Sequence, residues 1–305
     1  MSCSQPIYMI RRGLKENGKQ DLVFATTVSS NLGLSTEELK RRYKDKLVPV
    51  PCGKCIGCRL DHSKEWAVRC VLESLNHLHN SFITLTYDEG HCPKRLKKVH
   101  LSNFIKRLRA AHPDITIRFF ACGEYGTLNG RPHYHALIFG YDFPDKEFLT
   151  NDGLSALFSS SELEKLWPYG ISSIGEVSLE SCAYTARYSM KKTKASKGDE
   201  FLLMSRRPGI AFDWFLDHQE MIYLSDHVYG NFGRNRHVAS VPRYFDKLAE
   251  QYGHDLTDVK NKRLERAVAF QQLAMKLHNT GHTEALNQLT EELLVSKIKY
   301  LRRYL

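Results

Sequence analysis

The segment from Ile115 to Gly140 constrains the fold most, because its pattern predicts two antiparallel strands joined by a tight turn. Residues 115–124 are mostly apolar, residues 126–130 read Gly-Thr-Leu-Asn-Gly, and residues 132–139 again resemble a strand. A glycine-bounded turn between two such runs is typical of a β-hairpin. We therefore expect the second strand to fold back beside the first.

Two histidines lie two residues apart on the second strand, His133 and His135. Alternate residues of a strand point to the same face, so this pair can grip one divalent metal ion. His77 and His79 have the same spacing but follow residues 59–76, which are predicted to be helical. Positions two apart on a helix diverge by roughly 200° and cannot share an ion. The strand context therefore distinguishes the first pair from the second.

A metal ion held by two imidazoles needs a further ligand, and Glu124 is the candidate. Antiparallel pairing is predicted to place Glu124 across the hairpin beside His133 and His135. Two imidazoles and one carboxylate, with positions left open, suit Mg²⁺ or Mn²⁺ acting on phosphate oxygens. The alternative is that Glu124 is a surface carboxylate at the end of a hairpin.

Two tyrosines, Tyr184 and Tyr188, lie four residues apart and thus on one face of a predicted helix. Each has a cation three residues further on, Arg187 after the first and Lys191 after the second. A phenol with a pKa of about 10 attacks phosphorus poorly unless a cation or a metal-polarised substrate stabilises the developing charge. The alternative is a packed aromatic face.

The basic residues of the chain predict an anionic partner. The net charge is +10, and the cations gather in five clusters, at residues 41–42, 94–98, 106–109, 187–197 and 206–207. One such cluster usually marks a solvated face, but five in a basic chain favour nucleic acid. No apolar run approaches the roughly 20 residues of a membrane span, and the start of the chain lacks the features of a secretory signal. We therefore expect a cytoplasmic protein that does not bind membranes.

Eight cysteines without a signal peptide favour free thiols in a reducing compartment. Three of them, Cys52, Cys55 and Cys58, are spaced so that their thiolates can converge on a zinc ion. A closed structural site needs four ligands, for which Cys3 is the candidate and His62 the alternative. A cysteine-containing loop without metal is the competing interpretation.

The order of predicted elements indicates an α+β fold. Strands are expected at 81–87, 115–124, 132–139 and 170–177, and helices at 35–46, 59–76, 101–111, from the capping box 161–164, from 178, and at 260–278 and 283–304. Residues 142–160 are interpreted as a polar connector. We predict an antiparallel sheet of about five strands with flanking helices on one face, followed by a C-terminal helical hairpin. The expected domains are an N-terminal segment with the cysteines (1–58), a catalytic domain (59–242) and a helical extension (243–305).

Three of these motifs, in this order, resemble the HUH endonuclease superfamily, and more closely the replication initiators of gokushovirus-like microviruses with single-stranded DNA. They are Phe82-Ile-Thr-Leu-Thr-Tyr87, Pro132-His-Tyr-His135 and the helix with paired tyrosines. Residues 51–59 and 207–214 are similar to that viral family's own signatures. The resemblance covers about residues 50 to 245.

The resemblance implies a rolling-circle initiator. A metal ion on His133, His135 and Glu124 polarises a phosphate of the single-stranded viral origin, and Tyr188 or Tyr184, assisted by Lys191, attacks it. The products are a 5′-phosphotyrosyl link and a 3′-OH that primes synthesis by the host polymerase with the host helicase, in the cytoplasm of the bacterial host. Arg187 stands where a lysine commonly follows the first tyrosine. Candidate DNA contacts are Arg131, Arg187 and Lys192.

Other functions remain open at this point. A plasmid-type initiator or a transposase would share the site and differ in its origin. A relaxase usually carries its tyrosine before the histidines, which is the wrong order here. A zinc-containing nucleic-acid-binding module without catalysis would explain the charge and the cysteines but would leave the histidines, Glu124 and the tyrosines unlinked.

Overall fold

The computed structural model describes residues 3–14, 20–43, 46–126, 130–151, 156–187, 199–232, 235–277, 279 and 283–301. The chain divides into two compact units, residues 1–61 with 263–305, and residues 62–262. Each unit has a hydrophobic core of its own.

The smaller unit contains a three-stranded antiparallel sheet in the order β2-β1-β3. Its elements are β1 (Ile7–Leu14), β2 (Gln20–Phe24), α1 (Ala25–Leu32), α2 (Thr36–Arg42), β3 (Leu47–Val50) and α10 (Thr283–Leu301). A small core joins the sheet to α1 and α2 through Ile10, Val28 and Leu39. The predicted capping box is confirmed, because Ser35 and Glu38 each bond the other's backbone N–H at the start of α2.

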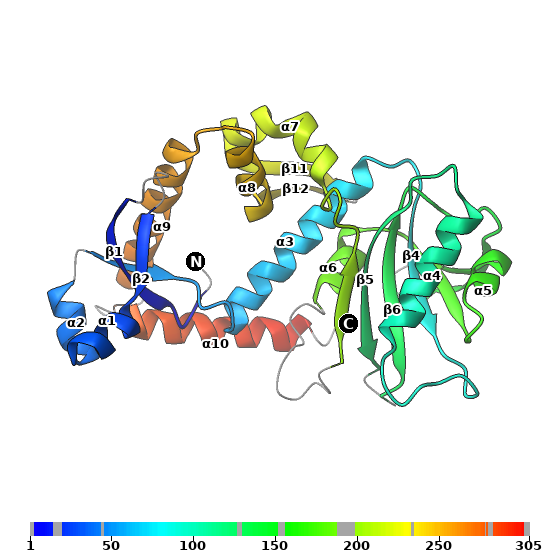
Figure 1. Ribbon diagram of the computed structural model, residues 1–305, viewed down its shortest axis with the longest axis horizontal. Helices are drawn as coiled ribbons and strands as arrows, with labels where there is room; N and C mark the ends of the chain where they lie inside the picture. Colours follow the sequence, from blue (N-terminus) through cyan, green and yellow to red (C-terminus); the bar gives the residue numbers. More distant parts are fainter. Residues whose placement is uncertain are drawn as a thin grey trace. The chain divides into compact units, whose positions relative to one another are not determined.

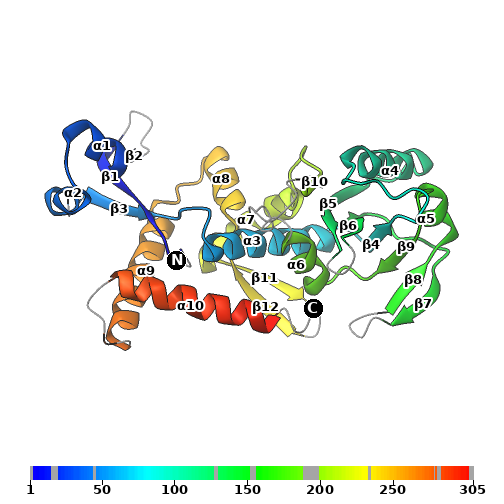
Figure 2. The same ribbon diagram turned by 90° about the horizontal axis from the view of Figure 1, so that it is seen from below.

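The larger unit is built on a seven-stranded antiparallel sheet in the order β10-β5-β6-β4-β9-β8-β7. Its strands are β4 (Asn80–Thr86), β5 (Arg118–Tyr125), β6 (Pro132–Phe139), β7 (Glu147–Asn151), β8 (Ala156–Ser159), β9 (Ser172–Gly175) and β10 (Phe201–Met204). The predicted α+β class and antiparallel sheet are confirmed. The polar connector at 142–160 was wrong in part, because it contains the edge hairpin β7–β8 (Figure 2). Every residue of β7 is exposed, so its sequence lacks the apolar alternation of a half-buried strand.

Helices cover both faces of this sheet, which corrects the prediction of one covered face (Figures 1 and 2). On one face α4 (Lys98–Ala111) and α5 (Ser161–Leu166) pack with alternate strand residues such as Leu85 and Tyr134. On the other, α3 (Ile56–Leu75), α6 (Leu179–Arg187), α7 (Phe212–Ser225) and α8 (Arg243–Gln251) pack with Phe120 and Leu137. Nearly every residue of β5 and β6 is buried, which is the pattern of a strand covered on both sides.

The rest of the described chain adds a two-stranded ribbon and the predicted C-terminal helices. The ribbon pairs β11 (His227–Phe232) with β12 (Asn235–Ser240), and α9 (Thr257–Leu277) precedes α10. Ser160, one residue before the predicted capping box, caps α5 by accepting a hydrogen bond from the backbone of Leu163. Among the described residues, no helix combines the length and apolarity needed to cross a membrane.

Candidate active site

The β5–β6 hairpin brings one carboxylate and two imidazoles to a single point. In the strand register Glu124 lies opposite His133, and Cys122 lies opposite His135, so all these side chains follow from one pairing. The Nε2 atoms of His133 and His135 lie 2.8 Å and 3.1 Å from the same oxygen, Oε1 of Glu124. These three residues have ligand atoms within 4.8 Å of one another.

Hydrogen bonds at the far side of each ring fix the direction of the imidazoles. The Nδ1 of His133 lies 3.2 Å from the carbonyl oxygen of Arg131 and can only donate to it. The Nδ1 of His135 shares a 3.0 Å hydrogen bond with the hydroxyl of Thr84, on the neighbouring strand β4. Such outer contacts set the tautomer and leave Nε2 as the ligand atom.

This arrangement requires a positive charge at its centre. In a neutral ring that donates through Nδ1, the Nε2 of His133 carries a lone pair, which faces a carboxylate oxygen of Glu124 at 2.8 Å. That contact is favourable only with a proton or a cation between the two atoms. Two imidazole nitrogens and one carboxylate oxygen therefore fit a divalent ion, with coordination positions left for substrate or water.

Glu124 is an ionised ligand despite its burial, with 2% of its surface exposed. Burial alone raises the pKa of this carboxyl, but the contacts of His133 and His135, and the charge the rings carry when protonated, outweigh it and lower the pKa to about 2. The alternative interpretation of Glu124 as a surface carboxylate is wrong, because its side chain is buried between the two histidines.

Helix α6 places one of the two predicted tyrosines at the same point. The hydroxyl of Tyr184 donates to Oε1 of Glu124 at 3.3 Å, and its ring lies edge-on to His135 at 5.0 Å between centroids. Cys182 and Ala186, on the opposite side of the helix, are fully buried in the core and hold this orientation. Tyr188, Lys191 and Lys192 lie outside the described residues, and Arg187 is the half-buried last residue of α6.

Two further predicted residues have structural contacts. The guanidinium of Arg131 donates to the carbonyl of Tyr87 at 3.2 Å, which ties the β6 end of the hairpin to the end of β4. His62 accepts a hydrogen bond from the indole of Trp66 at 3.3 Å. His62 is not among the clustered ligands, whereas Cys3, Cys52, Cys55 and Cys58 form a second group with ligand atoms within 4.8 Å of one another.

Two residues on β4 support the site and were not predicted from the sequence. Thr84 orients His135, and Phe82 stacks on the same ring at 5.6 Å between centroids. Both belong to the strand motif Phe82–Tyr87, whose alternation already indicated that Phe82 and Thr84 share a face. Only the sheet order β5-β6-β4 shows that this face is the one carrying the histidines.

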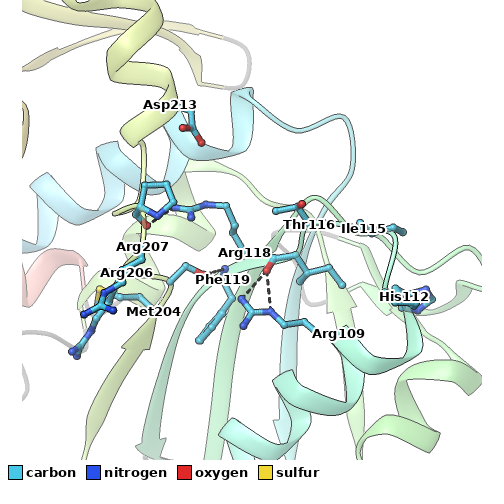
Figure 3. Close-up of a pocket in the computed structure, with 14 residues that line it drawn as sticks. Arg109, His112, Ile115, Thr116, Arg118, Phe119, Met204, Arg206, Arg207 and Asp213 are labelled. Atoms are coloured by element: carbon cyan, nitrogen blue, oxygen red, sulfur yellow. Dashed lines mark hydrogen bonds between the residues drawn. The ribbon is translucent and has the colours of Figure 1, made fainter.

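A buried ionic network, also not predicted from the sequence, holds the motif at 207–214. Glu73 on α3 pairs with Arg118 on β5 and accepts from the backbone N–H of Ala211. Arg118 also donates to the carbonyls of Pro208 and Gly209, and Arg69 donates to that of Ile210. The same loop lines an open cavity of about 820 Å³ (Figure 3). No residue of the Glu124 cluster lines this cavity, so it is a separate feature.

Comparison with known proteins gives consistent matches. Residues 80–193 match a family described as replication-associated protein ORF2. The chain is 35% identical over 289 residues to replication-associated protein ORF2 of Spiroplasma virus 4, covering 86% of each chain. It is 31% identical over 210 residues to replication-associated protein VP4 of Bdellovibrio phage phiMH2K, covering 64% of this chain and 65% of that relative. It is 30% identical over 235 residues to replication-associated protein ORF4 of Chlamydia phage 1, with 70% and 57% covered. No solved structure matches the chain.

Proposed function

The chain belongs to this family of viral replication-associated proteins, and from that premise we propose that it initiates rolling-circle replication by nicking and rejoining single-stranded origin DNA. One observation carries the proposal. The hydroxyl of Tyr184 and the Nε2 atoms of His133 and His135 all meet at one oxygen of Glu124, at 3.3, 2.8 and 3.1 Å. A phosphate bound at that point would touch the metal ligands and the nucleophile together.

His133, His135 and Glu124 would hold Mg²⁺ or Mn²⁺. When bound, such an ion supplies Lewis-acid polarisation of a phosphate oxygen and stabilises the negative charge of the transition state. The residues of the chain prepare the site for it, because Thr84 and the carbonyl of Arg131 hold both rings with Nε2 facing inward. Positions left open by three protein ligands would accept the phosphate.

The role of Glu124 toward Tyr184 is orientation. A carboxylate whose pKa is about 2 is a weak base, so it holds the phenol by a hydrogen bond and does not take its proton at neutral pH. The phenol proton would pass to solvent as the bond to phosphorus forms. Arg187, one helical turn further along α6, would offset the charge that develops on the phenolate and the phosphate.

The reaction is a transesterification. The oxygen of Tyr184 bonds to phosphorus, the bond from phosphorus to the 3′ oxygen breaks, and the 3′ oxygen leaves as a hydroxyl. The 5′-phosphate remains on the tyrosine, and a later attack by a 3′-OH reverses the step and rejoins the strand. No nucleotide cofactor is consumed because each step exchanges one phosphodiester for another.

Tyr188, with Lys191 and Lys192 close to it in sequence, would supply the second nucleophile. A second tyrosine can cleave the regenerated origin after one round while the first still holds the old end. Host polymerase and helicase would extend the released 3′-OH in the cytoplasm of the bacterial host. Arg131, Arg187 and Lys192 are the candidate contacts to the DNA backbone.

Covalent capture of DNA tests the proposal. The protein would be incubated with Mn²⁺ and single-stranded oligonucleotides tiled over the origin region of its own viral genome, then resolved in SDS. We expect an adduct that persists in SDS, weakens in Tyr184→Phe or Tyr188→Phe, and disappears in the double variant. Tyr229→Phe, an exposed tyrosine elsewhere on the chain, is the matched control and should keep the adduct.

The same experiment separates the alternatives. Tight binding without an adduct under any metal ion would contradict nicking and favour a nucleic-acid-binding module without catalysis. An adduct that persists in the double variant would exclude both tyrosines as nucleophiles. Cleavage of a plasmid or transposon origin in preference to the viral one would assign the chain to a different class of nickase. Mapping the nick with each single-tyrosine variant then shows which tyrosine opens the origin.

A further inference from the structure

The second ligand cluster of the molecule combines the first described residue with a loop about fifty residues further along the chain. We infer that Cys3, Cys52, Cys55 and Cys58 bind one tetrahedral zinc ion as four thiolates. Their sulfur atoms lie within 4.8 Å of one another, three of the four cysteines are buried, and Cys52 is half-buried. This inference does not depend on the proposed nicking activity.

The separation of the sulfur atoms distinguishes a single ion from its competitors. Four sulfurs bound at about 2.3 Å to one ion in a tetrahedron lie about 3.8 Å apart. The sulfurs of Cys3 and Cys55 are 3.8 Å apart. A disulfide would bring two sulfurs to about 2.05 Å. An iron–sulfur cluster would hold its cysteines further apart, because several iron atoms and bridging sulfides lie between them.

The backbone around the cluster is arranged to stabilise negative sulfur. The amides of Lys54 and Cys55 donate to the sulfur of Cys52 at 3.4 and 3.2 Å. The amide of Cys52 donates to Cys3 at 3.3 Å, and that of Cys58 to Cys55 at 3.5 Å. Gly53, with a φ of +72°, allows the turn that directs two amides at one sulfur. Amides that orient and stabilise the ligands are the outer shell that metal sites require.

The composition of the cluster argues against a metal-free thiol core. In the part of the chain that the structure describes, this buried cluster contains cysteines alone, with no aliphatic or aromatic side chain packed against it. Four small thiols bury too little apolar surface to hold the start of the chain against a distant loop. A metal ion supplies the missing stabilisation, because binding a structural zinc ion contributes directly to the free energy of folding.

The donor set selects the metal and its role. Four soft thiolates in a tetrahedron favour Zn²⁺ over Mg²⁺ or Mn²⁺, which prefer oxygen ligands. With four protein ligands no coordination position is left for a substrate, so the ion is structural. It would join Cys3 to the connection between β3 and α3, where Cys55 and Cys58 flank the first residue and the first turn of α3.

Metal content and spectroscopy of the full-length protein test this inference. We expect one zinc ion per chain after purification, measured by elemental mass spectrometry. Cobalt exchanged into the site should give the visible bands of tetrahedral thiolate coordination. Each of Cys3→Ser, Cys52→Ser, Cys55→Ser and Cys58→Ser should weaken zinc binding at least about 100-fold. Cys92→Ser, at a half-buried cysteine outside the cluster, should leave it unchanged.

Several results would overturn the inference. Wild-type protein without stoichiometric zinc, or with the visible absorption of an iron–sulfur cluster, would reject it. Full zinc affinity in Cys3→Ser would exclude the fourth ligand. If a serine variant does not fold, native mass spectrometry of the wild type still decides the question, because a folded chain at the mass of the free polypeptide contradicts the site.

Discussion

Two carboxylates in the larger unit are equally buried and yet serve different ends. Glu73 and Glu124 each expose 2% of their surface, and the pKa of each is lowered by its partners against the effect of burial. Glu73 pairs with the guanidinium of Arg118 and a backbone amide, both of which are donors at any pH. Glu124 faces two imidazoles and a phenol, which can exchange protons or bind metal. The partners, more than the burial, distinguish a structural ion pair from a reactive site.

The difference also lies in what each cluster leaves open. Around Glu73 every contact connects pieces of backbone, so the network fixes the 207–214 loop and has no place for a ligand. Around Glu124 three groups converge on one oxygen without satisfying it, because a neutral imidazole offers that oxygen a lone pair. Variants of the two carboxylates should therefore separate stability from chemistry.

The largest expected effect is the loss of stability in Glu73→Gln. The amide keeps the shape of the side chain but leaves Arg118 buried without its charge partner, which costs about 3–5 kcal/mol. Chemical denaturation followed by tryptophan fluorescence measures the loss. Exposed Glu89→Gln is the control and should change the free energy of unfolding by less than about 0.5 kcal/mol. Equal stability of both variants would show that the ion pair is not structural.

The next effect is a loss of metal binding in Glu124→Gln. The amide oxygen can still contact His133 and His135, so we expect a much smaller loss of folding stability than in Glu73→Gln. An amide is a weaker ligand than a carboxylate, and Mn²⁺ affinity and adduct formation should fall at least about 100-fold. Calorimetry of Mn²⁺ binding measures the first, and SDS gels the second. A variant that loses stability and keeps Mn²⁺ affinity would reverse the comparison.

A smaller effect is expected when the contact behind His135 is removed. Thr84→Val keeps the shape of the side chain and deletes the hydroxyl that bonds Nδ1, so Mn²⁺ affinity should fall roughly 10- to 100-fold. Thr86→Val is the matched control, because Thr86 is opposite His133 in the register and its hydroxyl makes no hydrogen bond to any described residue. Similar losses in both variants would mean that the effect comes from the strand and not from the contact.

The smallest effect is the pH dependence of the Glu73 pair. The pKa of Glu73 is lowered in the folded chain; burial alone would raise it, but its contacts with His77, Arg118 and Ala211 outweigh burial. The pair's contribution to stability is therefore complete above the unfolded pKa of about 4.3 and is lost as pH falls through the folded pKa. The stability gap between wild type and Glu73→Gln should stay constant from about pH 5 to 8. Below about pH 4 it should narrow by at most about 1.4 kcal/mol per pH unit. A gap that widens in acid would contradict this sign.

Local sequence determined much of the fold and part of the site. Periodicity, caps and turn residues predicted the β5–β6 hairpin, the helix containing Tyr184 and most helices of the larger unit, because those patterns depend on neighbours a few residues away. The hairpin alone also placed Glu124 beside His133, since a short turn leaves little freedom of register. The spacing of Cys52, Cys55 and Cys58 likewise indicated convergence within one loop.

Tertiary structure decided what depends on distant pairing. That Thr84 supports His135, that Tyr184 faces Glu124, and that Cys3 joins the cysteine loop follow from sheet order and packing between segments about fifty residues apart. No local pattern carries that information, because register across a sheet and the face a helix presents are chosen by the whole core. For the same reason the exposed β7–β8 hairpin and the second covered face of the sheet became visible only in three dimensions.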